Sequence, residues 1–145
     1  KPAVSPSPSD HLSLAVMIQR VIGIKLFLLL VGLPAMAGPT VIIDRCHDGD
    51  TCRTRTGEKI RIACIDAAEL TGPRATPKRA EAARDYLRQL VVGKEVLIRR
   101  IGLDRYGRAI AEIYLWPLNI GEEMVASGHA RILQPYARQC PWALL

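Results

Sequence analysis

Apolar and polar residues alternate through much of the chain after Gly38, and this alternation predicts a small β-rich domain. Five stretches are rich in β-branched residues and bounded by turn residues, as short strands are: 41–48, 50–56, 58–66, 94–101 and 108–115. In the third stretch, Ile60, Ile62 and Cys64 share one face. Asp66 has the same parity, so it can serve as a ligand only if the strand ends or bends before it.

Two segments have helical spacing instead. The first is predicted to begin with Thr76 as N-cap and Pro77 at the first helical position, and to stop at the glycine after its apolar stripe. The second is predicted to begin with Asn119 as N-cap, with Glu122 as a capping-box partner, and to end at Gly128. The stripe of the first helix consists of Ala80, Ala83, Leu87, Leu90 and Val91.

The order of elements is three strands, a helix, two strands, a helix and a tail, residues 129–145, for which no structure is predicted. Five short strands with a helix between the third and the fourth predict a mainly β fold with helices (α+β). We expect an OB-fold, a five-stranded Greek-key barrel with two to three packed helices. With 145 residues, the chain is long enough for one such domain.

The first 37 residues have a different character from the rest. Residues 1–10 are rich in Pro and Ser, and we expect them to be disordered. Residues 17–37 resemble a secretory signal peptide, with a basic start, an apolar run over 26–33 and an A-x-A cleavage site ending at Ala37. The predicted domains are therefore 1–37, an extension and leader with Met17 as the natural start, and 38–145. We expect an exported protein, periplasmic or secreted, with no stable membrane association after cleavage; the alternative is a membrane anchor formed by an uncleaved leader.

The charge balance favours a polyanionic partner without establishing one. The chain has 20 Lys and Arg against 14 Asp and Glu, a net charge of +6. Residues 1–37 hold three of the basic and one of the acidic residues, which leaves 17 against 13, or +4, for the remainder. Many basic domains bind nothing anionic, so composition alone predicts a basic globular domain.

The four cysteines lack the C-x-x-C pairs of a zinc site. In an exported protein they can form up to two disulfides, with three possible pairings. Cys46 and Cys52 flank an Asp-Gly-Asp turn, where a bridge across the hairpin would stiffen that turn. Cys64 lies on an apolar face, so a buried thiol is the simplest expectation for it. His47 and His129 are expected to be ordinary surface or strand residues.

Residues 48–69 can gather several carboxylates and one guanidinium at one end of the sheet: Asp48, Asp50, Arg61, Asp66 and Glu69. The stretch 104–108 supplies another guanidinium. Oxygen ligands hold a hard cation, and guanidinium groups bind phosphate, so the pattern predicts a metal-dependent phosphodiesterase acting on nucleic acid. Structural interpretations exist for each part. The Asp-Gly-Asp turn can cap backbone N–H groups, Arg61 can pair with Glu58 or Glu69, and Arg108 can pair with Glu112.

Three motifs, DGDT, RIACIDAAE and DRYGR, stand in this order between residues 41 and 136. Together they resemble the staphylococcal nuclease (thermonuclease-like) family. The resemblance implies an OB-type barrel and calcium-dependent hydrolysis of DNA and RNA that leaves 3′-phosphates. It implies DNA or RNA as the partner and Ca²⁺ as the cofactor, and we expect a monomer.

The resemblance also implies a role for particular residues. Metal ligation falls to Asp50, Asp66 and the backbone carbonyl of Ala67, with Asp48 near the ion without binding it. The catalytic trio is Arg61, Glu69 and Arg108. Substrate contacts fall to Arg105, Tyr106 and Tyr136.

The chain departs from the family pattern after Gly128. The family continues into a longer C-terminal helix with tyrosines near its start that flank the bound nucleotide. Here only Tyr136 is available and Gln134 stands where an aromatic residue is expected, so the last helix is predicted to be short or incomplete. One alternative function is a catalytically inactive module that grips nucleic acid or peptide, although the full set of carboxylates and arginines argues against it. Another is a truncated, unstable product. The preference between DNA and RNA stays open.

Overall fold

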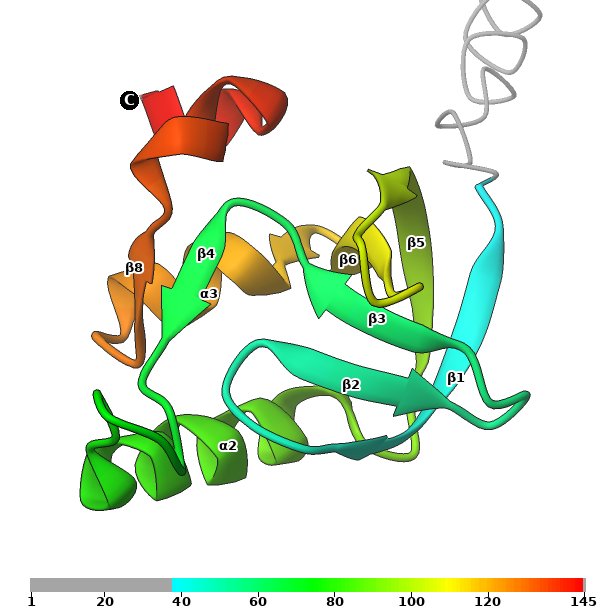
Figure 1. Ribbon diagram of the computed structural model, residues 1–145. Helices are drawn as coiled ribbons and strands as arrows, with labels where there is room; N and C mark the ends of the chain where they lie inside the picture. Colours follow the sequence, from blue (N-terminus) through cyan, green and yellow to red (C-terminus); the bar gives the residue numbers. More distant parts are fainter. Residues whose placement is uncertain (1–37, 145) are drawn as a thin grey trace, which may run out of the picture. The chain divides into compact units, whose positions relative to one another are not determined.

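Five strands form a closed barrel in the computed structural model, which describes residues 38–144 (Figure 1). Antiparallel pairing runs in the order β3-β2-β1-β5-β6, and a parallel pairing of β3 with β6 closes the ring. The short strand β7 (Leu118–Asn119) extends β6. The barrel strands are β1 (Thr40–Cys46), β2 (Thr51–Thr54), β3 (Lys59–Ile62), β5 (Glu95–Leu103) and β6 (Ala109–Leu115). The predicted OB-type α+β fold is confirmed.

Two α-helices in the described part of the chain occupy the predicted places. Helix α2 (Pro77–Val91) begins at the predicted proline, although the side chain of Thr76 makes no capping hydrogen bond. Helix α3 (Ile120–Ala126) has Asn119 as its N-cap, as predicted, because Asn119 Oδ1 accepts the backbone N–H groups of Gly121 at 2.9 Å and Glu122 at 3.2 Å. The predicted capping-box bond from the side chain of Glu122 is not among the hydrogen bonds of the described residues. The predicted stripe of α2 packs on the barrel, with Ala80, Ala83, Leu87 and Val91 fully buried.

The predicted third strand, residues 58–66, is wrong as a single element. Strand β3 ends at Ile62, and the chain turns at Cys64, whose φ of 65° lies in the left-handed region. It then resumes as β4 (Ile65–Ala67), which leaves the barrel and pairs antiparallel with β8 (Ala130–Ile132). The condition set for Asp66 is therefore met, because the strand bends before it and frees its side chain from the apolar face.

The C-terminal tail folds into two short 3-10 helices, η1 (Gln134–Gln139) and η2 (Pro141–Leu144), where the family pattern has a longer helix. A disulfide joins Cys64 to Cys140, so the expectation of a buried thiol at Cys64 is wrong. The indole N–H of Trp142 donates to the buried carboxylate of Glu112 at 2.9 Å. The tail is thus fixed by a covalent bond to the turn after β3 and by a partly buried hydrogen bond to β6. A second disulfide, Cys46–Cys52, bridges the β1–β2 hairpin.

The predictions for residues 1–37, the leader, its cleavage and the membrane anchor, lie outside the described residues. Within residues 38–144, no helix has the length and apolarity needed to cross a membrane.

The two disulfides allow a stability test with an internal comparison. Cys64–Cys140 closes a sequence separation of 76 residues and Cys46–Cys52 one of 6. In the chain-entropy model, these loops correspond to about 4.5 and about 2.4 kcal/mol of stabilisation at 25 °C. We expect the pair Cys64→Ala and Cys140→Ala to lower the free energy of unfolding by more than Cys46→Ala and Cys52→Ala, as measured by urea denaturation. Equal losses of unfolding free energy in the two double variants would contradict the larger stabilisation expected from Cys64–Cys140.

Candidate active site

The Asp-Gly-Asp turn between β1 and β2 is pressed against two other elements. A Cβ atom placed on Gly49 would lie 2.7 Å from the Cβ of Ala67 on β4 and 2.7 Å from that of Ala83 on α2. Only glycine fits this approach. Asp48 Oδ1 accepts the backbone N–H of Asp50 at 3.0 Å, so the capping interpretation is right for Asp48. Asp50 points elsewhere, into the space between β3 and β4.

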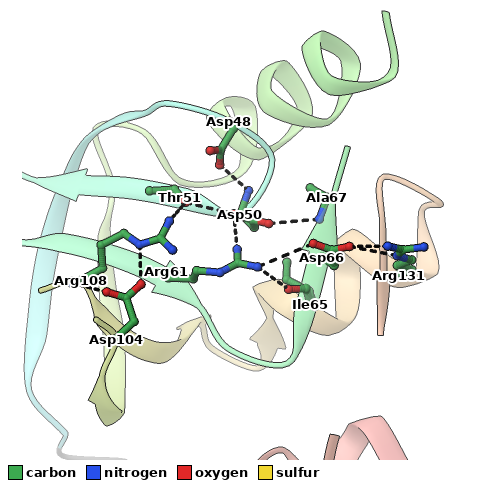
Figure 2. Close-up of polar contacts among 10 residues, drawn as sticks. All are labelled: Asp48, Asp50, Thr51, Arg61, Ile65, Asp66, Ala67, Asp104, Arg108 and Arg131. Carbon is green, nitrogen blue, oxygen red and sulfur yellow. Dashed lines mark hydrogen bonds and ion pairs between the residues drawn. The ribbon is translucent and has the colours of Figure 1, made fainter. Parts of the chain in front are cut away.

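Asp50, Arg61 and Asp66 form one linked group at the end of the barrel (Figure 2). The guanidinium of Arg61 pairs with Asp50 Oδ1 and lies 3.8 Å from Asp66 Oδ1. Asp50 is only 7% exposed, and its other oxygen accepts the backbone N–H of Ala67 at 3.1 Å. Arg61 also donates to the carbonyl of Ile65 at 3.3 Å. The turn before β2 and the strands β3 and β4 therefore meet around a single guanidinium.

The electrostatics of this group keep Arg61 charged. Burial alone would lower its pKa, but the charge of Asp50 and the hydrogen bond to it outweigh burial, so the pKa of Arg61 is raised. Burial, followed by the negative charge of Asp50, raises the pKa of Asp48. Asp48 and Asp50 are therefore two neighbouring carboxylates in a poorly solvated turn, and Arg61 compensates the charge of Asp50.

The second predicted guanidinium reaches the same group through Thr51. Arg108 donates to Thr51 Oγ1 at 3.2 Å, and Thr51 Oγ1 donates to Asp50 Oδ1 at 3.0 Å. Asp104 fixes Arg108 by accepting its Nε–H at 2.7 Å and its backbone N–H at 3.0 Å. Burial alone would raise the pKa of Asp104, but these bonds together outweigh burial, so its pKa is lowered. The ring of Tyr106, which is 66% exposed, lies beneath the guanidinium of Arg108 at 5.6 Å and that of Arg105 at 4.8 Å.

Asp66 and Glu69 border a pocket of about 540 Å³ on the other side of the group. Arg131 on β8 stands opposite Asp66 in the strand register and donates two hydrogen bonds to its Oδ2, at 2.7 and 3.0 Å. Glu69 is exposed in the loop after β4, and its backbone carbonyl accepts the N–H of Thr76. A smaller pocket of about 370 Å³ lies beside Asp48, Thr51 and Arg108.

The structural interpretations of the two arginines are wrong. Glu58 pairs with Arg100 at 2.6 Å, and Glu112 pairs with Arg99. The carboxylates that Arg61 approaches are Asp50 and Asp66 rather than Glu58 or Glu69, and Arg108 pairs with Asp104. Tyr136 is 49% exposed on η1, and no polar contact in the described residues joins its side chain to the carboxylate group.

The sequence interpretation missed three contributors. Thr51 bridges Asp50 to Arg108, Asp104 orients Arg108, and Arg131 binds Asp66. Thr51 and Asp104 stand inside the quoted motifs, and an Asp at the start of a turn that ends in Gly107 is a recognisable signal. Arg131 carries no local signal, because only the pairing of β4 with β8 brings it to Asp66.

The donor atoms here suit a hard cation. Among the described residues, no group of three His, Cys, Asp or Glu side chains is arranged to hold a metal. Two carboxylates nevertheless converge on one positive group, Arg61, with the backbone of Ala67 beside them. All these donors are oxygens, which Ca²⁺ and Mg²⁺ prefer. An ion fits if it takes the place of the guanidinium between the carboxylates.

The family model of the staphylococcal nuclease homologues matches residues 59–141, which is more than half of the chain. The chain belongs to the staphylococcal nuclease homologues. The matched segment includes Arg61, Asp66, Glu69 and Arg108. Asp50 precedes it, and the ion pair with Arg61 places it in the same site.

Relatives of this staphylococcal nuclease homologue carry nuclease names. A protein of Haemophilus influenzae named "Uncharacterized endonuclease" is 32% identical over 100 residues, covering 68% of this chain and 54% of the relative. An Escherichia coli protein with the same printed name is 32% identical over 99 residues, covering 63% of this chain and 60% of the relative. A "Probable staphylococcal-like nuclease" of Oryza sativa is 35% identical over 85 residues, covering 59% of this chain and 21% of the rice protein. The chain thus spans little more than half of the bacterial relatives and about a fifth of the rice protein.

The close packing of Gly49 generates a test of how the turn positions Asp50. We expect Gly49→Ala to lower the free energy of unfolding by about 1–3 kcal/mol, because the new methyl group must displace Ala67 or Ala83. Gly102→Ala is the control, since a Cβ there meets no atom within 4 Å and its φ is not positive. Thermal and urea denaturation measure both. A Gly49→Ala protein as stable as the Gly102→Ala protein would contradict the packed turn.

Proposed function

We propose that the protein is a nuclease that hydrolyses phosphodiester bonds of DNA, RNA or both, with Ca²⁺ as its cofactor and 3′-phosphates as products. The observation that carries this proposal is the connected set of two guanidinium groups, Arg61 and Arg108, joined through Asp50 and Thr51. Planar guanidinium groups bind phosphate oxygens through paired donors. Family membership and the names of the relatives support the nuclease activity in this proposal.

Asp50, Asp66 and the carbonyl of Ala67 would hold the ion. Ca²⁺ accepts irregular sets of carboxylate, carbonyl and water oxygens, which suits a site with so few protein anions. When bound, the ion would polarise a phosphoryl oxygen and favour an attacking hydroxide. We expect weak Ca²⁺ binding that tightens when a substrate phosphate is present.

The protein's own groups would carry the remaining chemistry. Arg61, once it leaves Asp50, and Arg108 would bind the non-bridging oxygens and stabilise the charge that develops there. Glu69 would orient the attacking water or accept its proton. Arg105 and Tyr106 lie next to Arg108, where a neighbouring part of the nucleotide would be held. Tyr136 is proposed as a further substrate contact.

Export is part of the proposal. Two disulfides form in the described domain, and such bonds persist in oxidising compartments. N-terminal sequencing of the purified protein tests it: a mature chain beginning at Gly38 supports cleavage of a leader after Ala37, and an intact leader contradicts cleavage.

The activity prediction concerns the catalytic trio. We expect Ca²⁺-dependent cleavage of single-stranded DNA that a chelator abolishes. Arg61→Ala, Glu69→Gln and Arg108→Ala should each reduce kcat/KM by roughly 10²–10⁴-fold, because each removes charge stabilisation or proton transfer. Arg100→Ala, which removes an exposed arginine paired with Glu58, is the matched control and should retain activity.

The ends of the products test the bond that is cut. Fragments with 3′-phosphates become primers for a polymerase only after phosphatase treatment, whereas fragments with 3′-hydroxyls serve directly. A folded protein that binds DNA but leaves it uncut with Ca²⁺ would overturn the nuclease proposal in favour of an inactive binding module.

A further inference from the structure

The pocket beside Asp66 and Glu69 contains more positive charge than the proposed reaction uses. Its lining includes Arg74 in the loop before α2, Arg79 in the first turn of α2, and His129 and Arg131 at β8. Arg131 is bound to Asp66. Arg74 and Arg79 are exposed, and neither joins an ion pair within residues 38–144. Two guanidinium groups therefore face this pocket with no anionic partner.

The volume of the pocket and the contacts that hold its wall in place suit a binding site. Its volume of about 540 Å³ lies within the range of pockets that hold small ligands. His129 is held in place, because its ring stacks on Tyr86 with centroids 4.4 Å apart and its backbone N–H donates to Met124 O at 2.9 Å. The hydroxyl of Tyr86 donates in turn to Glu123 at 2.5 Å. The wall of the pocket is thus braced by both helices and β8.

The position of the pocket relates it to the proposed cleavage site. Asp66, Ala67 and Glu69 border the pocket, and they belong to the same segment that carries the proposed metal ligands. Arg108 and Arg131 lie on opposite sides of Asp50 in Figure 2. A strand whose scissile phosphate meets Arg61 and Arg108 would enter the pocket if it continued past Asp66.

We propose that Arg74 and Arg79 form a subsite for a further phosphodiester of the substrate strand, on the side of the scissile bond away from Tyr106. This inference rests on the proposed nuclease function and names its substrate class: single strands with several phosphates. Guanidinium groups in a groove that follows the backbone bind single strands without reading their bases. The subsite therefore raises the affinity for longer strands and does not discriminate between base sequences.

The test uses a double variant of the full chain that carries both Arg74→Gln and Arg79→Gln. It is compared with a control double variant that removes the same charge elsewhere. The control pair is Arg84→Gln with Arg100→Gln, two arginines outside the pocket that pair with Asp85 and Glu58. Arg131 is left unchanged because it touches Asp66. The substrates are a thymidine dodecamer and the dinucleotide TpT, whose single phosphodiester leaves nothing for the subsite.

We expect the double variant in the pocket to raise the KM for the dodecamer on the order of tenfold at low salt, and to lower the ratio of kcat/KM for dodecamer to TpT by the same factor. The slope of log affinity against log salt should shrink by about 0.7 for each arginine that contacts a phosphate. An unchanged ratio, or an equal loss in the control pair, would overturn the subsite, since the effect would then be absent or would reflect net charge alone.

A binding measurement separates this proposal from the nuclease function. Fluorescence anisotropy of a labelled dodecamer in chelator, between about 50 and 200 mM salt, reports binding without cleavage. If the unaltered protein cuts nothing but still binds the dodecamer through Arg74 and Arg79, the nuclease proposal fails and the subsite stands. If it binds with the same affinity and salt slope as the double variant, the subsite fails whether or not cleavage occurs.

Discussion

One guanidinium organises the site of this protein. Arg61 extends from β3 to Asp50 in the turn before β2 and to Asp66 on β4, and it also donates to the carbonyl of Ile65. Without it, the 7%-exposed carboxylate of Asp50 would be buried with no cationic partner, which costs several kcal/mol. In the proposed reaction, the same guanidinium would exchange those carboxylates for a substrate phosphate, and Asp50 and Asp66 would then hold the ion. Its position would therefore couple the stability of the fold to the proposed chemistry.

Local patterns in the sequence are sufficient to predict the barrel and to place most residues of the candidate site in short motifs. Strands of β-branched residues, the proline that opens α2 and the Asn119 cap each act within a few residues, so their structures follow from propensity and capping. The carboxylates and arginines also stand in short motifs, and the fold brings Asp50, Arg61, Asp66 and, through Thr51, Arg108 together.

The features that the sequence did not predict depend on distant contacts. Alternation alone continues β3 through Cys64, but the bridge to Cys140 and the pairing of β4 with β8 accompany a turn there. Arg131 reaches Asp66 only through that pairing. The tail was unpredictable for the same reason, since its short 3-10 helices are held by a disulfide and by the bond from Trp142 to Glu112 rather than by helical periodicity.

The measurement that most directly tests the role of Arg61 is a calorimetric Ca²⁺ titration of Arg61→Ala beside the unaltered protein, with no nucleotide present. Arg100→Ala removes an equal charge elsewhere and serves as the control. We expect Ca²⁺ to bind Arg61→Ala more tightly than either other protein, because the guanidinium no longer occupies Asp50 and Asp66. An affinity equal to or weaker than that of the Arg100→Ala protein would contradict a site that the ion and Arg61 share.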